Sequence, residues 1–489
     1  METLAERAKL ILQTAPATPA IEFESHWHTW GDLAAVADKI SALLGASGIP
    51  ANAPVALVSR NHPALIAALI GLIAENRTIQ MIYPFQASSG IIRDINRLKP
   101  AAIILTPTDL TPDVEPALQS QTIAAILCDN MAVSAAPGLE ISGPTTTHAT
   151  INEPQIEVLT SGTTGPPKQF PIRFALIRDN YISAALTPPA PDAPPFLLYM
   201  PLGNISGIYT TLPTLLNGHR ARLLERFNIP AWVDYVKTYR PTQHGVPPSM
   251  LGQLLDLNIA KTDLASLKSM GSGAAPLDPA VQQAFEDHYG IPVLLSYGAT
   301  EFGGPVCGMT LELHREFGRS KLGTVGRKYP HCDLRIIDPD NGTILPANSD
   351  GLIEVLAPRI QPDWISTSDI GMIDADGFLF LRGRADGAIM RGGFKILPET
   401  IERALLQHPS VAEAAVVAVT DARVAQVPGA MIRLKPDQNP PTIDALTLHL
   451  RQLVMATHLP VHWRFVESLP RNPSMKIDRV AIKRAFSAP

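Results

Sequence analysis

A stretch rich in glycine and hydroxyl side chains, in the first half of the chain, most restricts how this sequence can fold. Residues 159–168 read LTSGTTGPPK, and they follow the short apolar segment 156–158. Neither a packed helix nor a strand accommodates this composition. Glycines allow close backbone approach to a ligand, while hydroxyls, free N–H groups and a lysine bind anionic oxygens. The stretch predicts a phosphate-binding loop at a strand end, the alternative being a polar surface turn.

The spacing within this loop differs from that of the Walker A motif. That motif requires G-x-x-x-x-G-K followed by Ser or Thr. Here only two residues separate Gly162 from Gly165, and Gln169 follows Lys168. The loop is therefore not a Walker A loop.

Short apolar runs alternate with stretches of helical periodicity up to about residue 300. Residues 30–48 place Leu33, Val36, Ile40 and Leu43 at helical spacing, and residues 64–74 form an apolar helix candidate. Strand candidates lie at 54–58, 101–105, 123–127, 195–202 and 292–296. This alternation predicts an α/β architecture with mostly parallel sheets.

Polar, glycine-bearing segments follow three of the expected strands, at residues 160–168, 203–207 and 297–301. In open α/β sheets, ligands bind at the carboxyl ends of strands. We therefore expect these three segments to converge on one cleft.

The character of the sequence changes after about residue 330. Residues 334–338 and 352–355 indicate strands of a β-rich region. Near the C-terminus, one helix is expected to align Ile401, Leu405 and His408, a strand covers 414–419, and a second helix aligns Ile443, Leu446, Leu450 and Leu453. The last hundred or so residues therefore predict a small α+β domain that begins near residues 384–386.

Length and composition narrow the possible functions. A chain of 489 residues is too long for one core, so two or more domains are expected. The net charge of −5 gives no electrostatic footprint for nucleic acid or an anionic membrane. Cys128, Cys307 and Cys332 lack metal or disulfide spacing, and the longest apolar run, 64–74, is too short to span a bilayer. With no signal-peptide core at the N-terminus, these features predict a cytoplasmic protein without membrane insertion or nucleic-acid partner.

Seven separated segments fit one family pattern, in the family's order and approximate spacing. The chain resembles the adenylate-forming superfamily of acyl- and aryl-CoA synthetases, peptide-synthetase adenylation domains and firefly-type luciferases, from about residue 17 to 480. The matching segments are 160–168, 271–276, 297–301, 367–369, 383–386, 392–402 and 469–476.

The resemblance implies a fold and a two-step reaction. Residues 1–383 would form a large N-terminal domain of two mostly parallel sheets plus a small β-barrel, and residues 384–489 a small mobile α+β domain. A small-molecule carboxylic acid attacks the α-phosphate of ATP, which gives acyl-AMP and pyrophosphate. The thiol of CoA, or of phosphopantetheine on an acyl carrier protein, then displaces AMP.

By family match, the nucleotide site draws on several segments. The phosphates of ATP would meet Thr160, Ser161, Gly162, Thr163, Thr164, Gly165 and Lys168. Tyr297 matches the aromatic that stacks on adenine, the alternative being a core tyrosine. Asp369 matches the acid that binds both ribose hydroxyls, and Arg384 a second ribose or phosphate contact. The remaining nucleotide contacts would be Gly273, Ala274, Ala275, Gly298 and Thr300.

Three residues match the family's catalytic groups. Thr300 matches an α-phosphate contact, and Glu301 the carboxylate that binds Mg²⁺. Lys476 matches the adenylation lysine, a cation that stabilises charge developing in the transition state. The alternative for Lys476 is an ordinary surface lysine, such as the nearby Lys483.

Two further features concern the second step. Asp386 lies at the family's hinge position. Gly392 and Gly393 match the loop that lines the tunnel for the pantetheine thiol.

The sequence departs from the family pattern at four positions. Asn204 stands where the family often has His, a residue that contacts the acyl carboxylate or gates the tunnel. Gln169, Ser368 and Met475 each replace the usual Gly. None of these departures removes a charged catalytic group, so the sequence predicts an active enzyme with an unusual substrate or acceptor.

The pocket for the acid would be lined by Asn204, Ile205, Gly245, Val246, Gly273 and Ala299. Relatives that activate α-amino acids place an Asp near Asn204 to pair the substrate ammonium, yet residues 200–216 contain no carboxylate. An unpaired ammonium is costly to bury. We therefore expect an aryl or aliphatic acid and not an α-amino acid.

Three classes of function compete. The first is a CoA ligase, and the second a stand-alone enzyme that loads a carrier protein. The third is another use of the fold, either a luciferase-like oxygenase or an inactive binding protein. The retained Lys168, Glu301, Asp369 and Lys476 argue against an inactive protein.

Overall fold

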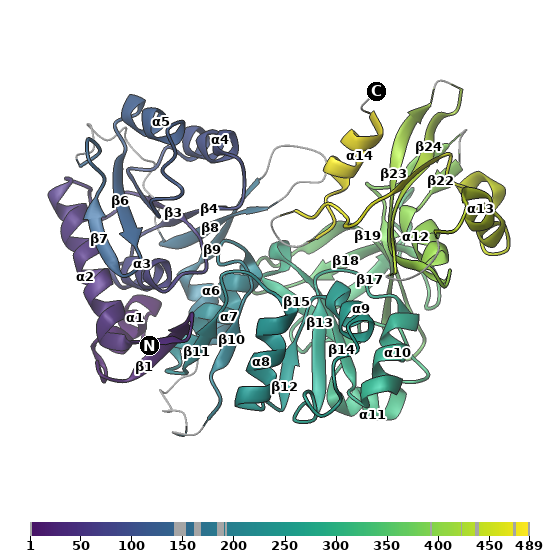
Figure 1. Ribbon diagram of the computed structural model, residues 1–489, viewed down its shortest axis with the longest axis horizontal. Helices are drawn as coiled ribbons and strands as arrows, with labels where there is room; N and C mark the ends of the chain where they lie inside the picture. The colour runs from purple at the N-terminus through teal and green to yellow at the C-terminus, as the bar shows by residue number, and fades with distance from the viewer. Residues whose placement is uncertain are drawn as a thin grey trace. The chain divides into compact units, whose positions relative to one another are not determined.

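The computed structural model describes residues 2–140, 153–160, 168–182, 190, 193–391, 394–421, 423–435, 440–472 and 476–487 (Figure 1). Contacts within the chain divide it into two compact units, Met1–Tyr239 and Arg240–Pro489. The predicted boundary between residues 383 and 384 lies inside the second unit and stays a prediction.

A seven-stranded sheet in the order β7-β6-β5-β3-β4-β8-β9 organises the first unit. Its inner pairings are parallel, whereas β7 and β9 pair antiparallel at the two edges. The strands are β3 (Val55–Val58), β4 (Ile79–Ile82), β5 (Ala102–Leu105), β6 (Ala124–Asp129), β7 (Ala132–Ala135), β8 (Gln155–Thr160) and β9 (Lys168–Arg173).

A four-stranded sheet in the order β10-β11-β1-β2 completes the strands of this unit. Its strands are β1 (Pro19–Phe23), β2 (His26–Thr29), β10 (Phe196–Leu198) and β11 (Ala221–Leu223). The helices are α1 (Leu4–Gln13), α2 (Trp30–Ala46), α3 (Pro63–Ala74), α4 (Ser88–Leu98), α5 (Val114–Ser120), α6 (Phe174–Tyr181), α7 (Ile205–Leu216) and α8 (Ile229–Tyr239).

Helix α3 shows how the sequence builds the core of the first unit. Its residues are apolar on every side, which is the pattern of a helix buried all round. Pro63 occupies the first turn, where its missing N–H has no intrahelical partner to lose. A Cβ on Gly71 would lie 2.8 Å from the Cβ of Ala37, so glycine lets α3 pack closely on α2.

Helix α2 confirms the helical periodicity but corrects one core residue. Leu33, Val36 and Ile40 are buried as expected, but Leu43 is only half-buried and Leu44 is fully buried in its place. The helix repeats every 3.6 residues, so four residues after Ile40 the buried face falls on position 44.

A five-stranded sheet in the order β12-β13-β14-β15-β16 begins the second unit. The pairings among β12, β13 and β14 are parallel, and those of β15 and β16 are antiparallel. These strands are β12 (Gln243–Gly245), β13 (Ser269–Gly273), β14 (Val293–Ala299), β15 (Gly304–Gly308) and β16 (Arg327–Lys328), with helices α9 (Pro248–Asp256), α10 (Pro279–Tyr289) and α11 (Leu311–Phe317).

Two further sheets follow along the chain. In the region expected to be β-rich, an antiparallel sheet joins β17 (Asp333–Ile337), β18 (Gly351–Leu356), β19 (Trp364–Ile373) and β20 (Leu379–Arg384). The last sheet has the order β22-β21-β24-β23, with β25 paired to β24. It comprises β21 (Ile389–Arg391), β22 (Phe394–Ile396), β23 (Val411–Asp421), β24 (Ala425–Leu434) and β25 (His462–Phe465), with helices α12 (Pro398–Leu406), α13 (Ile443–Arg451) and α14 (Arg479–Ser487).

The predicted helices near the C-terminus are present, with corrections at their ends. Ile401, Leu405, Leu446 and Leu450 are buried in one core cluster. His408 lies beyond the end of α12, and Ile443, at the first position of α13, is 46% exposed. Terminal turns lie at the margin of a core, so periodicity overestimates their burial.

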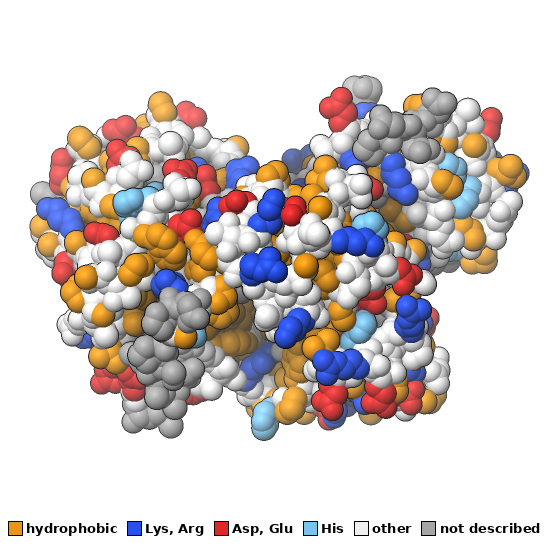
Figure 2. Space-filling model, turned by 60° about the horizontal axis from the view of Figure 1, so that its bottom comes forward, with side chains coloured by type: hydrophobic (Ala, Val, Ile, Leu, Met, Phe, Trp, Pro, Cys, Tyr) orange, Lys and Arg blue, Asp and Glu red, His pale blue; other side chains and the backbone are white. Residues whose placement is uncertain are grey.

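No helix among the described residues is long and apolar enough to cross a membrane. On the face shown in Figure 2, Lys and Arg side chains lie among Asp, Glu and uncharged side chains. Cys128 and Cys307 are buried, and burial raises the pKa of each thiol to about 12. Neither thiol is therefore an activated nucleophile.

Gly383 on β20 provides a test of the β19–β20 geometry. Its φ is +151°, and a Cβ there would lie 2.5 Å from Oε2 of Glu399. We expect Gly383→Ala to lower the free energy of unfolding by about 1–3 kcal/mol, the usual cost of such a backbone conformation. Gly387→Ala is the control, because its Cβ would meet nothing closer than 3.8 Å. Equal stability of the two variants in denaturant unfolding would contradict this geometry.

Candidate active site

The carboxyl ends of β12, β13 and β14 form one edge of the mixed sheet in the second unit. The three strands are parallel neighbours, so their ends lie side by side. This edge brings together the predicted pocket and nucleotide residues Gly245, Val246, Gly273, Ala274, Ala275, Tyr297, Gly298 and Ala299. Of the three polar segments expected to converge, only 297–301 lies in this unit, so their convergence stays a prediction.

Two glycines at this edge permit a backbone approach that no other residue allows. A Cβ on Gly273 would lie 2.8 Å from Oγ of Ser296 on the adjacent strand. A Cβ on Gly298 would lie 2.6 Å from the carbonyl oxygen of Gly304, at an irregularity in the β14–β15 pairing. Glycine at both positions therefore lets the neighbouring strands pack closely.

Tyr297 is both a core residue and a site residue. Residues 297–299 continue strand β14, so the segment expected to follow the strand begins inside it. Tyr297 is only 7% exposed, and its hydroxyl donates to Oδ2 of Asp369 at 2.7 Å. Burial, reinforced by Asp369, raises the pKa of Tyr297, so the hydroxyl stays a donor. The sequence analysis assigned Tyr297 to adenine and Asp369 to ribose without a contact between them. In the structure, the hydroxyl of Tyr297 orients the carboxylate of Asp369.

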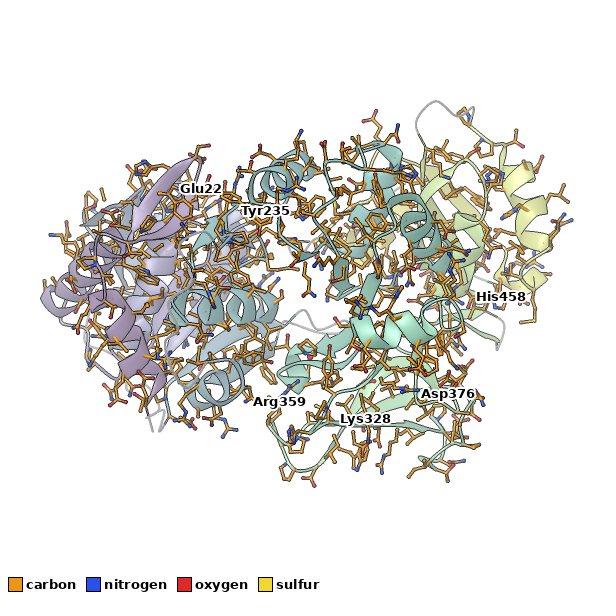
Figure 3. The ribbon with its side chains drawn as sticks, turned by 90° about the horizontal axis from the view of Figure 1, so that it is seen from below. Glu22, Tyr235, Lys328, Arg359, Asp376 and His458 are labelled. Carbon is orange, nitrogen blue, oxygen red and sulfur yellow. The ribbon has the colours of Figure 1, made fainter. Side chains whose placement is uncertain are left out.

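Thr300 and Glu301 lie in a short 3₁₀ turn, Thr300–Phe302, directly after β14. Arg359, labelled in Figure 3, holds this turn. Its Nε donates to the carbonyl oxygen of Phe302 at 2.8 Å, and its Nη2 to that of Pro305 at 2.7 Å. Glu301 is exposed, as a carboxylate that reaches a ligand must be. Sequence reasoning missed Arg359, which lies outside every motif.

Arg384 occupies the centre of the charged residues. Its Nη1 donates to Oδ1 of Asp369 at 3.3 Å, and the two residues are paired across β19 and β20. Its Nε and Nη2 donate to the two carboxylate oxygens of Asp386 at 2.9 and 2.7 Å, and Nη2 also donates to Oγ of Ser368. The bond to Asp386 is the main cause that raises the pKa of Arg384. The predicted ribose acid, second ribose contact and hinge residue are thus directly connected.

Two hydrogen bonds join the backbone of Lys476 to Asn472. Its backbone N–H donates to Oδ1 of Asn472 at 3.0 Å, and the N–H of Asn472 donates to the carbonyl oxygen of Lys476 at 2.7 Å. A β-bridge joins Arg471 to Ile477 just outside this pair. The backbone position of Lys476 is therefore fixed, although part of the side chain is exposed.

The surroundings of Lys476 connect it to the other predicted site residues. Protein atoms around the ammonium lower the pKa of Lys476 below the usual lysine range, and the charge of Arg384 lowers it further. Asp369 and Glu301 oppose this shift. The lysine therefore shares one electrostatic environment with three predicted nucleotide and catalytic residues.

A second layer of charges supports the segment that carries Lys476. Arg479 donates through Nη1 and Nη2 to the carboxylate of Glu402, at 2.6 and 3.0 Å, and through Nη1 to the carbonyl oxygen of Val416 at 2.6 Å. Glu399 lies 3.6 Å from Arg479, and its Oε2 is buried without a hydrogen bond among the described residues. Burial raises the pKa of Glu399. Glu402 belongs to a family motif, but its bond to Arg479 could not be predicted from the sequence.

The phosphate-loop segment of the first unit begins and ends in a paired hairpin. Strands β8 and β9 are antiparallel, with Thr160 opposite Lys168. The predicted Ser161, Gly162, Thr163, Thr164 and Gly165 lie outside the described residues, as do the side chains of Thr160 and Lys168. Their roles stay predictions.

Glu157 ties this hairpin to the sheet, which the sequence did not indicate. Its Oε2 accepts from Nε2 of Gln80 at 3.0 Å and from Nε2 of Gln169 at 2.8 Å, and its Oε1 accepts from Nε2 of Gln155 at 2.9 Å. Gln169 replaces a usual Gly, and the structure gives that replacement a partner.

The segment with Asn204 and Ile205 also lies in the first unit. Asn204 precedes helix α7, which begins at Ile205. Asn61 holds the preceding loop: its Nδ2 donates to the carbonyl oxygens of Met200 and Leu224 at 3.1 Å, and its Oδ1 accepts from the N–H of Leu202 at 3.0 Å. The convergence of this segment with those of the second unit stays a prediction.

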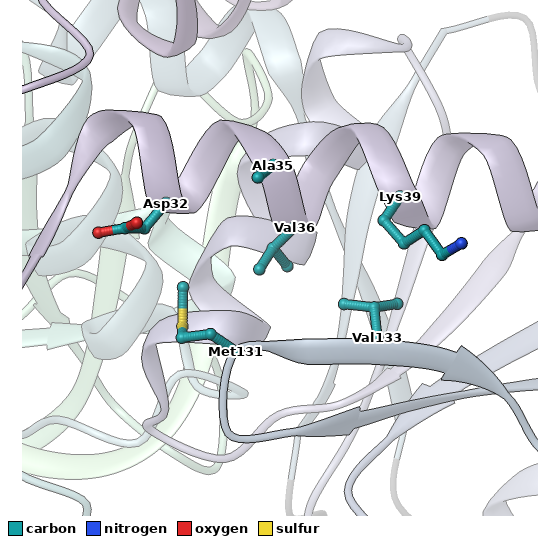
Figure 4. A pocket seen from close by; sticks show the side chains of 6 residues that line it. All are labelled: Asp32, Ala35, Val36, Lys39, Met131 and Val133. Carbon is teal, nitrogen blue, oxygen red and sulfur yellow. The ribbon is translucent and has the colours of Figure 1, made fainter.

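Three other observations concern predicted sites. Gly392 and Gly393 lie outside the described residues. The described residues hold no group of three or more His, Cys, Asp or Glu placed to bind a metal ion. A surface pocket of about 280 Å³, lined by Asp32, Ala35, Val36, Lys39, Met131 and Val133, lies between α2 and the β6–β7 turn and contains no predicted site residue (Figure 4).

Comparisons with known proteins bear on this arrangement. The sequence model of the family described as AMP-binding enzyme matches residues 8–360, and that of the AMP-binding enzyme C-terminal domain matches residues 400–476. The chain belongs to the AMP-binding enzyme family. The resemblance to the adenylate-forming superfamily is thereby confirmed.

Relatives and a solved structure cover nearly the whole of this AMP-binding enzyme. A 2-succinylbenzoate–CoA ligase of Bacillus pumilus (strain SAFR-032) is 28% identical over 97% of this chain and 97% of its own. Fatty acid–acyl-carrier-protein ligase ScoC of Streptomyces coeruleorubidus is 27% identical over 99% of this chain and 97% of its own. The structure of o-succinylbenzoate CoA synthetase (MenE) from Bacillus subtilis, in complex with the acyl-adenylate OSB-AMP, has a TM-score of 0.79 at 23% identity, over 98% of this chain and 97% of that chain.

These findings establish fold and class. The AMP-binding enzyme has the expected α/β fold, and it is an ATP-dependent acid–thiol ligase of the acyl- and aryl-CoA synthetase type.

The bond between Tyr297 and Asp369 can be tested by removing one hydroxyl. We expect Tyr297→Phe to lower the free energy of unfolding of the AMP-binding enzyme by about 1–2 kcal/mol, because a hydrogen bond to a charged, partly exposed carboxylate is lost. Tyr329→Phe is the control, since that hydroxyl has no hydrogen bond within the part of the chain that the structure describes. The two variants would unfold at the same denaturant concentration if the Tyr297 bond contributed nothing.

Proposed function

We propose that this ligase activates an aryl or aliphatic carboxylic acid as its adenylate and transfers the acyl group to the thiol of CoA. The observation that carries the proposal is the hydrogen-bonded cluster of Tyr297, Asp369 and Arg384 in the second unit, with Glu301 in the turn directly after the strand of Tyr297. A cation, a carboxylate for ribose and an exposed carboxylate beside a glycine-lined strand edge suit a nucleotide with its phosphates.

In the first step, a carboxylate oxygen of the acid attacks the α-phosphorus, and the bond from that phosphorus to the bridging oxygen breaks. We assign to Lys476 the stabilisation of charge that develops on the oxygens of this transition state. Asp369, which Tyr297 orients, accepts hydrogen bonds from the ribose hydroxyls. Arg384, which contacts Asp369, binds the ribose or a phosphate beside it. Thr300 contacts the α-phosphate from its turn.

Glu301 suits the magnesium ion that the resemblance implies. Mg²⁺ is commonly held by one or two carboxylates together with substrate phosphates and water, so a single exposed carboxylate fits this role. When bound, the ion would neutralise charge on the phosphates. Residues Thr160, Ser161, Gly162, Thr163, Thr164, Gly165 and Lys168 would hold the leaving pyrophosphate.

In the second step, the sulfur of the thiol attacks the acyl carbonyl, and AMP leaves with the former carboxylate oxygen. Gly392 and Gly393 would line the path of the thiol arm, and Asp386 would serve as the hinge between the steps. Relatives named as CoA ligases support CoA as the acceptor.

The acid is best sought among compounds without an α-ammonium group. Residues 200–216, which include Asn204 and Ile205 before and at the start of α7, contain no Asp or Glu. A buried ammonium in such a pocket has no partner charge. The 2-succinylbenzoate that appears in the relatives' names is a suitable first member of the substrate panel.

A second candidate acceptor is a carrier-protein phosphopantetheine. The observation that favours it is the match to ScoC, a ligase of fatty acids and acyl carrier protein, over nearly the full length of both chains. The two candidates share the adenylation step, and both acceptors carry the same thiol arm. They differ in the molecule that carries this arm.

ATP–pyrophosphate exchange tests the first step. The panel comprises 2-succinylbenzoate with other aryl acids, short, medium and long-chain aliphatic acids, and α-amino acids, each with Mg²⁺ and ATP. We expect exchange with one acid class, and a loss of about 10²–10³-fold in Lys476→Ala, the usual effect of removing one group that stabilises the transition state. Lys483→Ala, which removes a lysine from the exposed face of α14, is the control and keeps wild-type exchange.

Exchange by Lys476→Ala at the wild-type rate would contradict the role of Lys476. Exchange with α-amino acids alone would contradict the assigned acid class. Silence of the wild type across the panel, with ATP still bound, would overturn adenylation of these acids.

The pH dependence of exchange tests the charge of Lys476. The protonated lysine is the active form, so the rate falls as the pH rises through the pKa of Lys476, which lies below the usual lysine value of about 10.4. Arg stays protonated above pH 12, so Lys476→Arg should lack this alkaline loss even if its maximal rate is lower. An identical alkaline loss in wild type and Lys476→Arg would assign it to another group.

The acceptor is settled by mass spectrometry after the acid is known. With ATP and that acid, we expect the wild type to form acyl-CoA from free CoA at a rate well above any acylation of a holo acyl carrier protein at equal concentration. The opposite order would replace the proposal with the carrier-loading alternative and leave adenylation intact.

A further inference from the structure

Ser368 stands directly before Asp369 on β19, at a position where the resemblance places glycine. Its hydroxyl oxygen accepts a hydrogen bond from Nη2 of Arg384. The side chain is half-buried beside the charged residues of the site. The family pattern has no hydroxyl at this position. Here the hydroxyl contacts Arg384, a residue that we assign to nucleotide binding.

The backbone of the hairpin does not require this hydroxyl. The carbonyl oxygen of Ser368 accepts from the N–H of Ala385 at 2.7 Å, and Asp369 pairs with Arg384 in the β-ladder. Glycine or alanine at position 368 would keep these backbone bonds. Among the described residues, the hydroxyl contacts only the side chain of Arg384.

The contacts of Arg384 show what the hydroxyl adds. Asp386 binds Nε and Nη2 at 2.9 and 2.7 Å, whereas the bond from Nη1 to Asp369 is long, at 3.3 Å. Without Ser368, the guanidinium would be held mainly by Asp386 and would move with the segment after β20. The long bond to Asp369 would then be the first to break. Ser368 binds the other hydrogen of Nη2 from β19, the strand of Asp369, and so fixes the guanidinium plane against that carboxylate.

We propose that Ser368 is a positioning residue for the nucleotide, which acts by holding Arg384 against Asp369. The inference rests on the proposed function, because it takes Arg384 and Asp369 as the residues that bind ribose and phosphate. Ser368 does not touch the nucleotide in this account. It keeps one guanidinium ready on the strand that supplies the ribose acid.

The direct test is the affinity of the full chain for ATP and for AMP, measured by titration calorimetry without any acid. We expect Ser368→Ala to weaken both affinities by about 3- to 10-fold, the effect of one lost hydrogen bond to a charged group, partly transmitted. Ser368→Thr keeps the hydroxyl on a residue that suits a strand, and should bind within about twofold of wild type. In pyrophosphate exchange, Ser368→Ala should raise KM for ATP by a similar factor and leave kcat within about twofold.

Two further variants separate positioning from a general structural effect. Ser366→Ala removes a neighbouring hydroxyl that donates to Glu354 and not to Arg384, so it should keep wild-type affinity. In an Arg384→Lys background, Ser368→Ala should cause no additional loss, because its only partner in the site is already changed.

Each outcome decides the matter. Wild-type affinity in Ser368→Ala, a loss that Ser368→Thr does not restore, or losses that add fully to those of Arg384→Lys would overturn the positioning role and leave the proposed function standing. Absence of ATP and AMP binding by the wild type would overturn the proposed function and this inference together.

Discussion

Arg384 joins three residues through its planar guanidinium group. Its guanidinium contacts Ser368, Asp369 and Asp386, and Asp369 in turn accepts the hydroxyl of Tyr297. A planar group with five donors is suited to such a junction, because each edge offers N–H bonds in a fixed direction. Arg384 therefore links β19 to the segment after β20, and Asp369 continues this chain of bonds to Tyr297 on β14.

The electrostatics of the site follow from this junction. Arg384 is a positive charge close to Lys476, so it makes the lysine ammonium less favourable, while Asp369 and Glu301 make it more favourable. A polyanionic ligand would relieve the repulsion between the two cations.

Much of this arrangement was predictable from the sequence, for physical reasons. Alternating periodicity identified the α/β fold, and helix α3 and strand β3 lie where apolar runs placed them. The motif residues Tyr297, Asp369, Arg384 and Lys476 were identified as site residues by family pattern, and their roles remain proposals. What the sequence did not contain was the pairing between them, because the bond from Tyr297 to Asp369 joins positions 72 residues apart. Supporting residues such as Arg359 and Asn472 act through the backbone of their neighbours, and such contacts leave no residue-type signature.

The segment that carries Lys476 has a mechanical consequence. Before Lys476 in the sequence, Arg471 binds Glu413 on β23 at 2.8 Å. After it, Arg479 binds Glu402 on α12. Between them, Oδ1 of Asn472 accepts the backbone N–H of Lys476. The segments on both sides of Lys476 are therefore bound to β23 and to α12. A displacement of Lys476 larger than its side chain allows would therefore carry parts of β23 and α12 with it.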